Sequence, residues 1–328
     1  MNVDLKMKAA VYDRYGGPDV ITLQVVPVIN PKEGEVLVKV YSSTVNRTDT
    51  GFRSAENLVS RLFSGLLRPK NRVLGCEFAG EVSAIGMGVE LYKVGDRVFG
   101  YDDNFFGGHA EFKIIAESGT MALIPEGVSY TQAAALTEGS HYALGNIRAA
   151  KVSAGDIVLV YGATGAIGTA AVQLLKYFGA YVVAVVNSKN TKLASSIGAD
   201  EVIDYQRQDF TNTNYHFDFV FDAAGKSSFG QCKSLLKSKG IYISTELGKC
   251  GENIWLAIST SWGRGKRVLF PIPSITREDV LFLGDLAQHG MFRAVIDRAY
   301  PLSQIVEAHR YVDTGQKTGN VLISLDSN

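Results

Sequence analysis

The sequence predicts an α/β fold in which a doubly wound parallel sheet follows a first half made mainly of strands. The stretch Ile157–Gly179 contains an apolar run, a turn with three glycines and a segment whose apolar residues recur at helical spacing. Strand and helix patterns then alternate, which is typical of crossover units in a parallel sheet. By contrast, Met7–Val40 has the pattern of short strands cut by glycine and proline turns. The chain therefore combines a strand-rich first part with a later part in which strands and helices alternate.

The elements expected around the glycine turn follow from these patterns. The predicted strands are Tyr181–Val186, Glu201–Ile203, Phe217–Phe221, Gly240–Ser244 and Val268–Phe270. The predicted helices are Lys189–Ile197, Phe229–Leu236 and Arg277–Gln288, and alanine-rich Tyr130–Ala150 is expected to form a helical lead into the turn. The tail is expected to hold a helix near Leu302–Thr314 and a last strand, and it can return to the first domain.

The composition suits a soluble globular protein. The chain has 328 residues with 46% hydrophobic content, enough for two domains. Lys plus Arg and Asp plus Glu are equal at 33 each. The chain therefore has no net positive charge that would favour nucleic acid or an anionic membrane as a partner. No apolar run reaches the roughly 20 residues that span a bilayer. The three cysteines are scattered without a C-x-x-C pair, and we expect a cytoplasmic protein.

The glycine turn predicts a dinucleotide site. Missing side chains let the backbone turn sharply and approach a pyrophosphate at the N-terminus of the following helix. A glycine pattern alone is weak evidence for a dinucleotide site. Here the evidence is stronger, because a strand with the apolar sequence of a buried strand precedes the glycines and a helix follows them. The turn residues expected to contact the cofactor are Gly162, Thr164, Gly165, Ala166, Ile167 and Gly168.

The residues after the next strand predict which dinucleotide binds. An NAD site would place an acid there to bind the ribose 2′-hydroxyl, whereas this chain has Asn187. Ser188, Lys189 and Lys192 can instead bind and neutralise a 2′-phosphate, which favours NADPH. The alternative is a solvated helix N-terminus with a serine or asparagine cap.

Two further strand ends are candidates for the nicotinamide half of the site. In an open α/β sheet, ligands lie beyond the carboxyl ends of the strands. Ala224 and Leu247 belong to the turns that follow two predicted strands. The alternative is that these two turns are ordinary loops that contact no ligand.

Nucleophilic catalysis has little support. The chain has no G-x-S-x-G motif, and its five histidines form no H-E-x-x-H or other ligand spacing.

The order of motifs resembles the medium-chain dehydrogenase/reductase superfamily, and within it the zinc-free quinone oxidoreductase (zeta-crystallin-like) branch. The motifs are M-K-A-A-V-Y, V-N-R-T-D-T, L-G-C-E-F-A-G-E-V-S-A-I-G, V-G-D-R-V-F-G, Y-G-A-T-G-A-I-G, G-A-D-E-V-I-D-Y and K-T-G-N-V-L-I. The resemblance implies a Rossmann NADP-binding domain, residues 126–288, inserted in a GroES-like β-barrel catalytic domain, residues 1–125 and 289–328. It also implies a homodimer formed through the Rossmann domain. For the 2′-phosphate, the family pattern points to Lys192 and Tyr205.

The resemblance also bears on zinc. Alcohol dehydrogenases of the superfamily hold a catalytic metal through cysteine, histidine and cysteine at three motif positions. Here those positions carry Asn46, Cys76 and Glu138, which are not a good zinc set, so we expect no metal. The alternative is a zinc-dependent alcohol dehydrogenase with an irregular set drawn from Cys76, Glu77, Asp49 and Glu138.

The resemblance implies hydride transfer from NADPH to a small molecule. Without a Lewis acid, a quinone or α,β-unsaturated carbonyl is the better acceptor, because its charge spreads over an enolate or hydroquinone oxygen. Asn46, Asp49 and Tyr142 are the expected catalytic residues. Asn46 would make polar contact with substrate or cofactor. Tyr142, beside His141, would replace an aromatic side chain that the family often carries at another position, or would simply pack in its helix. A further alternative is a weakly catalytic NADPH-binding partner protein.

Overall fold

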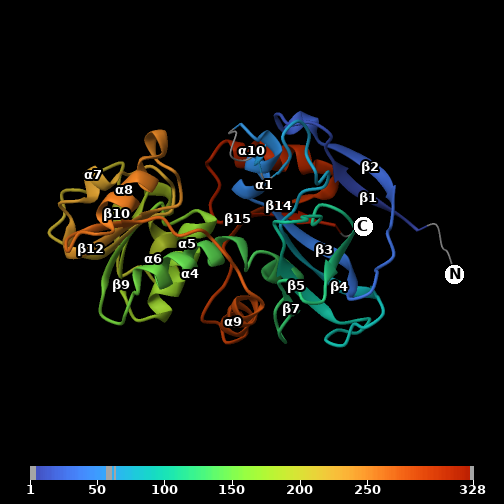
Figure 1. The fold of residues 1–328 in the computed structure, drawn as a ribbon. Helices are drawn as coiled ribbons and strands as arrows, with labels where there is room; N and C mark the ends of the chain where they lie inside the picture. Colours follow the sequence, from blue (N-terminus) through green and yellow to red (C-terminus); the bar gives the residue numbers. More distant parts are fainter. Residues whose placement is uncertain (1–4, 57–60, 63, 326–328) are drawn as a thin grey trace. The chain divides into compact units, whose positions relative to one another are not determined.

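The computed structural model describes residues 5–56, 61–62 and 64–325. The chain divides into two compact units, each with its own sheet (Figure 1). Unit 1 comprises Met1–Glu138 and Ile275–Asn328, and unit 2 comprises Gly139–Ser274.

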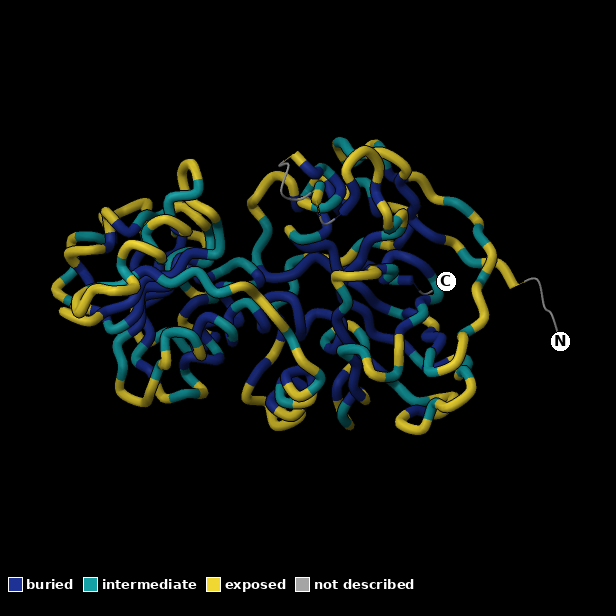
Figure 2. The backbone as a smooth tube through the Cα atoms, viewed as in Figure 1, coloured by how far each residue is buried: buried dark blue, intermediate teal, exposed yellow. Residues whose placement is uncertain are grey.

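Unit 2 is built around a six-stranded parallel sheet with the order β10-β9-β8-β11-β12-β13. Counted from β8, this is the order 3-2-1-4-5-6 of a doubly wound dinucleotide-binding sheet, so the predicted fold class is confirmed. The strands are β8 (Ile157–Tyr161), β9 (Tyr181–Val186), β10 (Glu201–Asp204), β11 (Phe217–Asp222), β12 (Leu236–Ser244) and β13 (Arg267–Leu269). The central strands are buried apolar runs, as expected for parallel strands covered on both faces (Figure 2).

The helices of unit 2 lie on both faces of this sheet, with α5 and α6 on one side and α7 and α8 on the other (Figure 1). They are α4 (Glu138–Ala150), α5 (Ala166–Tyr177), α6 (Thr191–Ser196), α7 (Phe229–Cys232) and α8 (Glu252–Thr260), with the short 3-10 helices η2 (Ser188–Asn190) and η3 (Lys249–Gly251). Helix α7 ends at Cys232, earlier than predicted, because Leu236 already pairs with Phe217 as part of β12.

Unit 1 is built around a larger sheet with the order β14-β15-β3-β4-β5-β7, in which β6 also pairs with β3. The strands are β3 (Glu35–Val45), β4 (Glu77–Ile85), β5 (Arg97–Tyr101), β6 (Phe112–Ala116), β7 (Met121–Leu123), β14 (Ile296–Pro301) and β15 (Asn320–Ser324), beside the pair β1 (Lys6–Val11) and β2 (Thr22–Pro27). The tail thus returns to the first part of the chain, since β15 pairs antiparallel with β3.

Helices and apolar side chains complete unit 1. The helices are α1 (Arg47–Ser54), α3 (Tyr130–Ala134), α9 (Arg277–Gln288) and α10 (Ile305–Asp313), with the 3-10 helices η1 (Pro18–Val20) and η4 (Leu302–Gln304). The core combines Val38, Phe78 and Met121 from the sheet with Ile305 and Val312 from α10. Within the described ranges, no helix is both long and apolar enough to cross a membrane.

The units divide at residues 138/139 and 274/275, whereas the predicted domain boundaries fall at 125/126 and 288/289. Helix α9 accounts for the second difference, because it packs on β7 of unit 1. At Gly284 a Cβ would lie 3.2 Å from Pro125 and 3.3 Å from Phe99, so the helix and the sheet edge are in close contact there. Helical periodicity does not report which sheet a helix covers.

Candidate functional site

The glycine turn of unit 2 brings β8, β11 and α5 into close contact. Gly162 has a φ of +75°, and a Cβ on it would lie 2.5 Å from Cβ of Ala224. A Cβ on Gly168 would lie 2.1 Å from the carbonyl oxygen of Gly162. Gly165, the N-cap of α5, differs because its nearest neighbour would be 4.0 Å away. Two glycines therefore serve packing, while the third leaves open the space where a pyrophosphate would meet the helix N–H groups.

The polar residues after β9, Ser188, Lys189 and Lys192, differ in whether they have a partner within the protein. The Ser188 hydroxyl donates to Oδ2 of Asp204, so it is already engaged within the protein. Asp204 would repel an anion, and Arg207 offsets its charge with Nε 3.3 Å from the same oxygen. Lys189 and Lys192 are exposed. Neutralisation of a 2′-phosphate here would depend on the lysines more than on the Ser188 hydroxyl.

This cluster is tied to the glycine turn. Asn187 is the N-cap of η2, and Nδ2 of Asn190, the last residue of η2, donates to Oγ1 of Thr164 at 3.4 Å. The ring of Tyr205 stacks on Tyr161 at the end of β8, with ring centroids 6.4 Å apart, and is 47% exposed. Unit 2 thus brings the predicted turn and 2′-phosphate residues to one edge of its sheet.

A buried aspartate shapes the loop after β11, and sequence reasoning missed its role. Asp222 accepts hydrogen bonds from the backbone N–H groups of Ala224 at 3.1 Å, Lys226 at 3.3 Å and Ser227 at 2.8 Å. The carboxylate therefore fixes the loop that places Ala224 against Gly162. An aspartate at a strand end before small residues is the only local signal for it. Leu247, after β12, is 41% exposed.

In unit 1, α1 starts from Asn46, and Asp49 holds that start in place. Oδ2 of Asp49 accepts from the Asn46 backbone N–H at 2.9 Å, and Oδ1 accepts from the Gly75 N–H at 2.9 Å. Asp49 is fully buried, and burial raises its pKa. Both oxygens are thus used in joining α1 to the loop before β4. The predicted catalytic role of Asp49 stays a prediction.

The Glu77 carboxylate, fully buried at the start of β4, accepts five hydrogen bonds. Thr44 Oγ1 and Asn46 Nδ2 donate to Oε2 at 2.6 and 2.7 Å. The Thr137 N–H, the Thr137 hydroxyl and the Glu138 N–H donate to Oε1 at 2.9, 2.8 and 2.6 Å. Because the Thr137 and Glu138 N–H groups donate to Glu77, they do not take part in a continuous helix. The helix predicted to lead into the glycine turn is therefore divided into α3 and α4. The second Asn46 amide hydrogen goes to Thr44 Oγ1, so any contact of Asn46 with a ligand would use its Oδ1.

Glu138 is a second buried carboxyl beside Glu77. Its Oε1 lies 2.5 Å from Thr48 Oγ1, and its Oε2 lies 3.4 Å from Cys76 Sγ. Burial, followed by the negative charge of Glu77, raises the pKa of Glu138 to about 8. Burial and the charges of Asp49 and Glu138 likewise raise the pKa of the Cys76 thiol. At neutral pH, the protonated acid and the neutral thiol are favoured.

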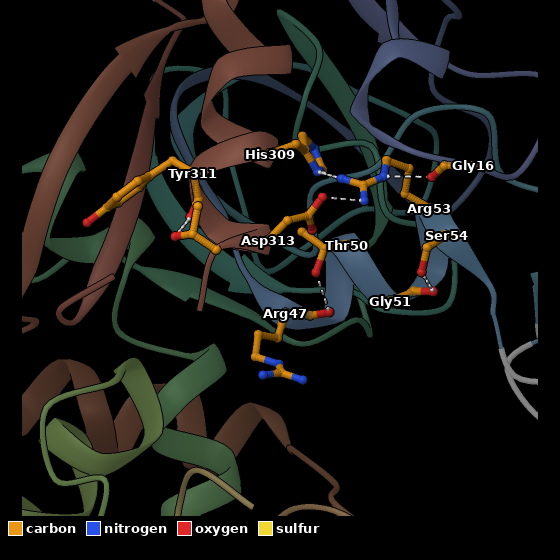
Figure 3. A network of polar contacts seen from close by, with 10 residues as sticks. Gly16, Arg47, Thr50, Gly51, Arg53, Ser54, His309, Tyr311 and Asp313 are labelled. Carbon is orange, nitrogen blue, oxygen red and sulfur yellow. Dashed lines mark hydrogen bonds and ion pairs between the residues drawn. The ribbon is translucent and has the colours of Figure 1, made fainter. Parts of the chain in front are cut away.

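The far end of α1 is anchored by Arg53, which is 2% exposed (Figure 3). Its Nε donates to the Gly16 carbonyl at 3.1 Å, and one terminal nitrogen donates to Asp313 at 2.8 Å. The other lies 3.1 Å from Nδ1 of His309, whose pKa is lowered well below its ordinary value chiefly by burial. Neutral His309 accepts this hydrogen bond. Both ends of α1 are therefore fixed.

Tyr142 lies on α4 in unit 2, half-buried, with its ring centroid 4.4 Å from that of His141. The other two expected catalytic residues, Asn46 and Asp49, come together in unit 1. The catalytic role of Tyr142 stays a prediction.

Comparisons with known proteins give the family. Residues 32–138 match the alcohol dehydrogenase GroES-like domain, and residues 197–323 match zinc-binding dehydrogenase. The 2-methylene-furan-3-one reductase of Solanum lycopersicum is 30% identical over 98% of this chain and 80% of its own. The chloroplastic NADPH-dependent alkenal/one oxidoreductase of Arabidopsis thaliana is 29% identical over the same shares. The quinone oxidoreductase of Coxiella burnetii superposes with a TM-score of 0.88 at 27% identity, covering 98% of this chain and 100% of its own.

The chain therefore belongs to the medium-chain dehydrogenase/reductase superfamily, in its quinone oxidoreductase-like branch. It is an oxidoreductase that uses a nicotinamide cofactor.

The family match named for zinc binding does not include the positions where alcohol dehydrogenases hold their catalytic metal. It covers residues 197–323, whereas those positions carry Asn46, Cys76 and Glu138. In the part of the chain that the structure describes, no group of three or more His, Cys, Asp or Glu side chains is arranged to hold a metal ion. The oxygens of Glu77 and Asp49 are already used as hydrogen-bond acceptors.

Alanine at Gly165 should affect cofactor binding, whereas alanine at Gly168 should affect stability. Gly165→Ala adds a methyl group to open space, so we expect the fold to persist and NADPH and NADH to bind more weakly. Gly168→Ala forces α5 away from the turn, and overpacking of this kind costs about 1–3 kcal/mol, so the melting temperature should fall without cofactor. Thermal unfolding with and without NADPH separates the two effects. Unaltered NADPH affinity in Gly165→Ala would contradict the pyrophosphate assignment.

Glu138 should make stability depend on pH. Its pKa rises from an ordinary value of 4.5 to about 8 on folding, so between these values the folded chain keeps a proton that the unfolded chain has lost. The stability contributed by this group is present below 4.5 and is lost as the pH rises through about 8. Glu138→Gln cannot titrate, and its denaturant midpoint should fall less than that of the unmodified chain over this range. Parallel curves for the two proteins would contradict the shifted pKa.

Proposed function

We propose that the chain is an NADPH-dependent, zinc-independent oxidoreductase that reduces a quinone or an α,β-unsaturated carbonyl compound. NADPH, when bound, supplies the hydride from C4 of its nicotinamide ring. The names of the tomato, Arabidopsis and Coxiella relatives, an enone-type reductase, an alkenal/one oxidoreductase and a quinone oxidoreductase, support this substrate class.

The observation that carries the proposal is the chemistry at the positions of the alcohol dehydrogenase metal. Asn46 donates both amide hydrogens to Thr44 and Glu77, and Cys76 faces the Glu138 carboxyl. An amide and a carboxyl of raised pKa replace two thiolates, which makes a poor set of donors for zinc. An acceptor that delocalises its own negative charge needs less help from a Lewis acid.

The choice of NADPH over NADH rests on unit 2. Asn187 stands where an acid would bind the 2′-hydroxyl, and Lys189 and Lys192 lie exposed beside it. The printed name of the Arabidopsis relative agrees with this choice. Asp204 opposes it, and the lysines and Arg207 supply the compensating charge.

We further propose a homodimer formed through unit 2 in a reducing compartment such as the cytoplasm. Trp255 and Ile258 on α8 and the nearby Trp262 are 70%, 55% and 93% exposed, and β13 is an edge strand of the parallel sheet. Exposed apolar clusters of this kind mark association surfaces. The three cysteines are free thiols. Light scattering should give twice the 35.5 kDa mass of the chain, and a monomer would contradict the proposal.

Lys192→Ala should weaken NADPH binding much more than NADH binding, because the lysine would neutralise the 2′-phosphate that NADH lacks. Loss of one charged contact corresponds to about 1.5–3 kcal/mol, or roughly tenfold to a hundredfold in Kd. Fluorescence titration with both cofactors measures the difference. An equal loss for the two would reject the assignment, and Lys233→Ala, on another part of unit 2, serves as the control.

Turnover tests the proposal as a whole. NADPH oxidation should be fast with a benzoquinone or an alkenal, slow with a saturated ketone, and unchanged by a chelator. Reduction of the ketone that a chelator abolishes would indicate a zinc-dependent alcohol dehydrogenase. NADPH binding without turnover of any of these compounds would indicate a binding protein.

A further inference from the structure

We propose that unit 1 docks on the surface of an anionic phospholipid bilayer through two neighbouring loops, residues 64–72 and 102–106, which together we call the loop surface. These loops present exposed apolar side chains flanked by basic ones. The inference goes beyond the proposed function and does not depend on it, because docking is measured without cofactor or acceptor.

The first loop is a closed turn whose outer part carries two leucines. The Lys70 N–H donates to the Ser64 carbonyl at 2.8 Å, and the Ser64 hydroxyl lies 2.8 Å from the Tyr15 hydroxyl. Leu66 and Leu67, within this turn, are 59% and 87% exposed. A leucine with so little of its surface covered has few neighbours in the protein. The turn therefore holds both leucines in solvent.

The second loop buries one phenylalanine and exposes its neighbour. Phe106 is 2% exposed and packs on Phe52 with ring centroids 5.0 Å apart, whereas Phe105 is 76% exposed. Oδ1 of Asp102 accepts from the N–H groups of Asn104 and Phe105 at 3.1 and 2.9 Å. These hydrogen bonds fix the loop in the conformation that leaves the Phe105 ring in solvent.

The two loops form one surface. Asn71 Nδ2 in the first loop donates to the Asn104 carbonyl in the second at 2.6 Å. Both loops also border one cavity of about 280 Å³, whose lining includes Ser64, Asn71, Asn104 and Phe106. The exposed leucines and Phe105 thus belong to neighbouring segments, and exposed apolar groups gathered in this way mark an interaction surface.

Basic side chains flank these apolar groups. Residues 57–76 of the sequence include Arg61, Arg68, Lys70 and Arg72 and no Asp or Glu. Arg68 and Lys70 are exposed on the first loop, next to the two leucines. The chain as a whole carries equal numbers of basic and acidic residues, so the positive charge of this segment is a local feature.

Acidic side chains near the loop surface reduce its charge without reversing it. Asp13 pairs with Arg72, and Asp102 pairs with the buried Lys113 at 2.7 Å. Asp103 is exposed on the second loop, where it opposes the two exposed basic side chains of the first. The loop surface therefore keeps a net positive charge, which is complementary to anionic headgroups.

An anionic bilayer suits this combination better than a protein partner does. The boundary between headgroups and acyl chains takes up apolar side chains, while neighbouring arginine and lysine side chains reach the phosphates. A stable protein interface needs a matching area of about 800 Å² on each partner. Side chains as exposed as Leu67 and Phe105 enter a fluid lipid surface without such a matching shape.

The experiment measures how much of the full chain sediments with lipid vesicles. One set of vesicles contains phosphatidylcholine and phosphatidylserine in equal amounts, and the other contains phosphatidylcholine alone. We expect much stronger binding to the first set. Raising the salt from about 0.1 M to about 1 M shortens the Debye length from about 10 Å to about 3 Å and should release most of the protein. Equal binding to the two sets, or no binding to the anionic one, would overturn the proposal.

Two double variants test the basic and the apolar parts separately. Arg68→Gln combined with Lys70→Gln should weaken binding to the anionic vesicles by about 25-fold, because each basic residue near such a surface contributes about fivefold. Leu66→Ser combined with Leu67→Ser should weaken it by at least about tenfold, because two leucines no longer enter the lipid. All four side chains are exposed, so the melting temperature should stay the same.

The matched controls lie at the other end of the β4–β5 pair, where residues 86–96 join the two strands. Lys32→Gln combined with Lys93→Gln removes two exposed charges there. Leu91→Ser combined with Val94→Ser removes two apolar side chains that are 51% and 60% exposed. Both control proteins should bind the anionic vesicles as the unmodified chain does.

Two results with the variants would contradict docking through the loop surface. Vesicle binding that falls equally in the test and control variants would reject this surface as the docking site. A lower mass by light scattering in Leu66→Ser with Leu67→Ser, with unchanged vesicle binding, would show that the loop surface joins two copies of the chain instead. A chain that turns over no quinone or enone but binds the vesicles as expected would fail the proposed function alone.

Discussion

The buried Glu77 carboxylate is the interaction on which the arrangement of unit 1 depends. Its five hydrogen bonds join the end of β3 at Thr44, the N-cap of α1 at Asn46 and the break before α4 at Thr137 and Glu138. A buried carboxylate without partners is very costly, so each segment is held where its donor reaches the charge. The positions of α1 and of the Glu138 side chain follow from this requirement.

A comparable constraint organises unit 2. The strand order reverses between β8 and β11, and the loops after these two strands meet where Gly162 touches Ala224. Asp222 holds the second loop through its backbone N–H groups. A side chain at Gly162 would push the two loops apart, and one at Gly168 would push α5 away from the turn. Gly165 leaves the helix terminus accessible to a phosphate.

The Glu77 and Glu138 carboxyls of unit 1 bear on the reaction that this chain can carry out. In alcohol dehydrogenases of the superfamily, a metal occupies the positions that here hold Asn46, Cys76 and Glu138, and the metal stabilises negative charge on the substrate oxygen. In this chain, the Thr48 hydroxyl donates to the Glu138 carboxyl, whose pKa is raised to about 8 chiefly by burial. Acceptors whose negative charge is already delocalised need less help from a Lewis acid, which agrees with the substrate class proposed for this chain.

The sequence by itself determined the features that local pattern encodes. Glycine spacing and strand and helix periodicity were sufficient for the doubly wound sheet, and the absence of an acid at Asn187 suggested the cofactor. Only the tertiary structure decided that Thr48 and Glu138, 90 residues apart, share a hydrogen bond, and that α9 belongs to unit 1. The physical reason is that periodicity reports neighbours along one element, whereas the burial of a charge and the donors that satisfy it depend on segments brought together by folding.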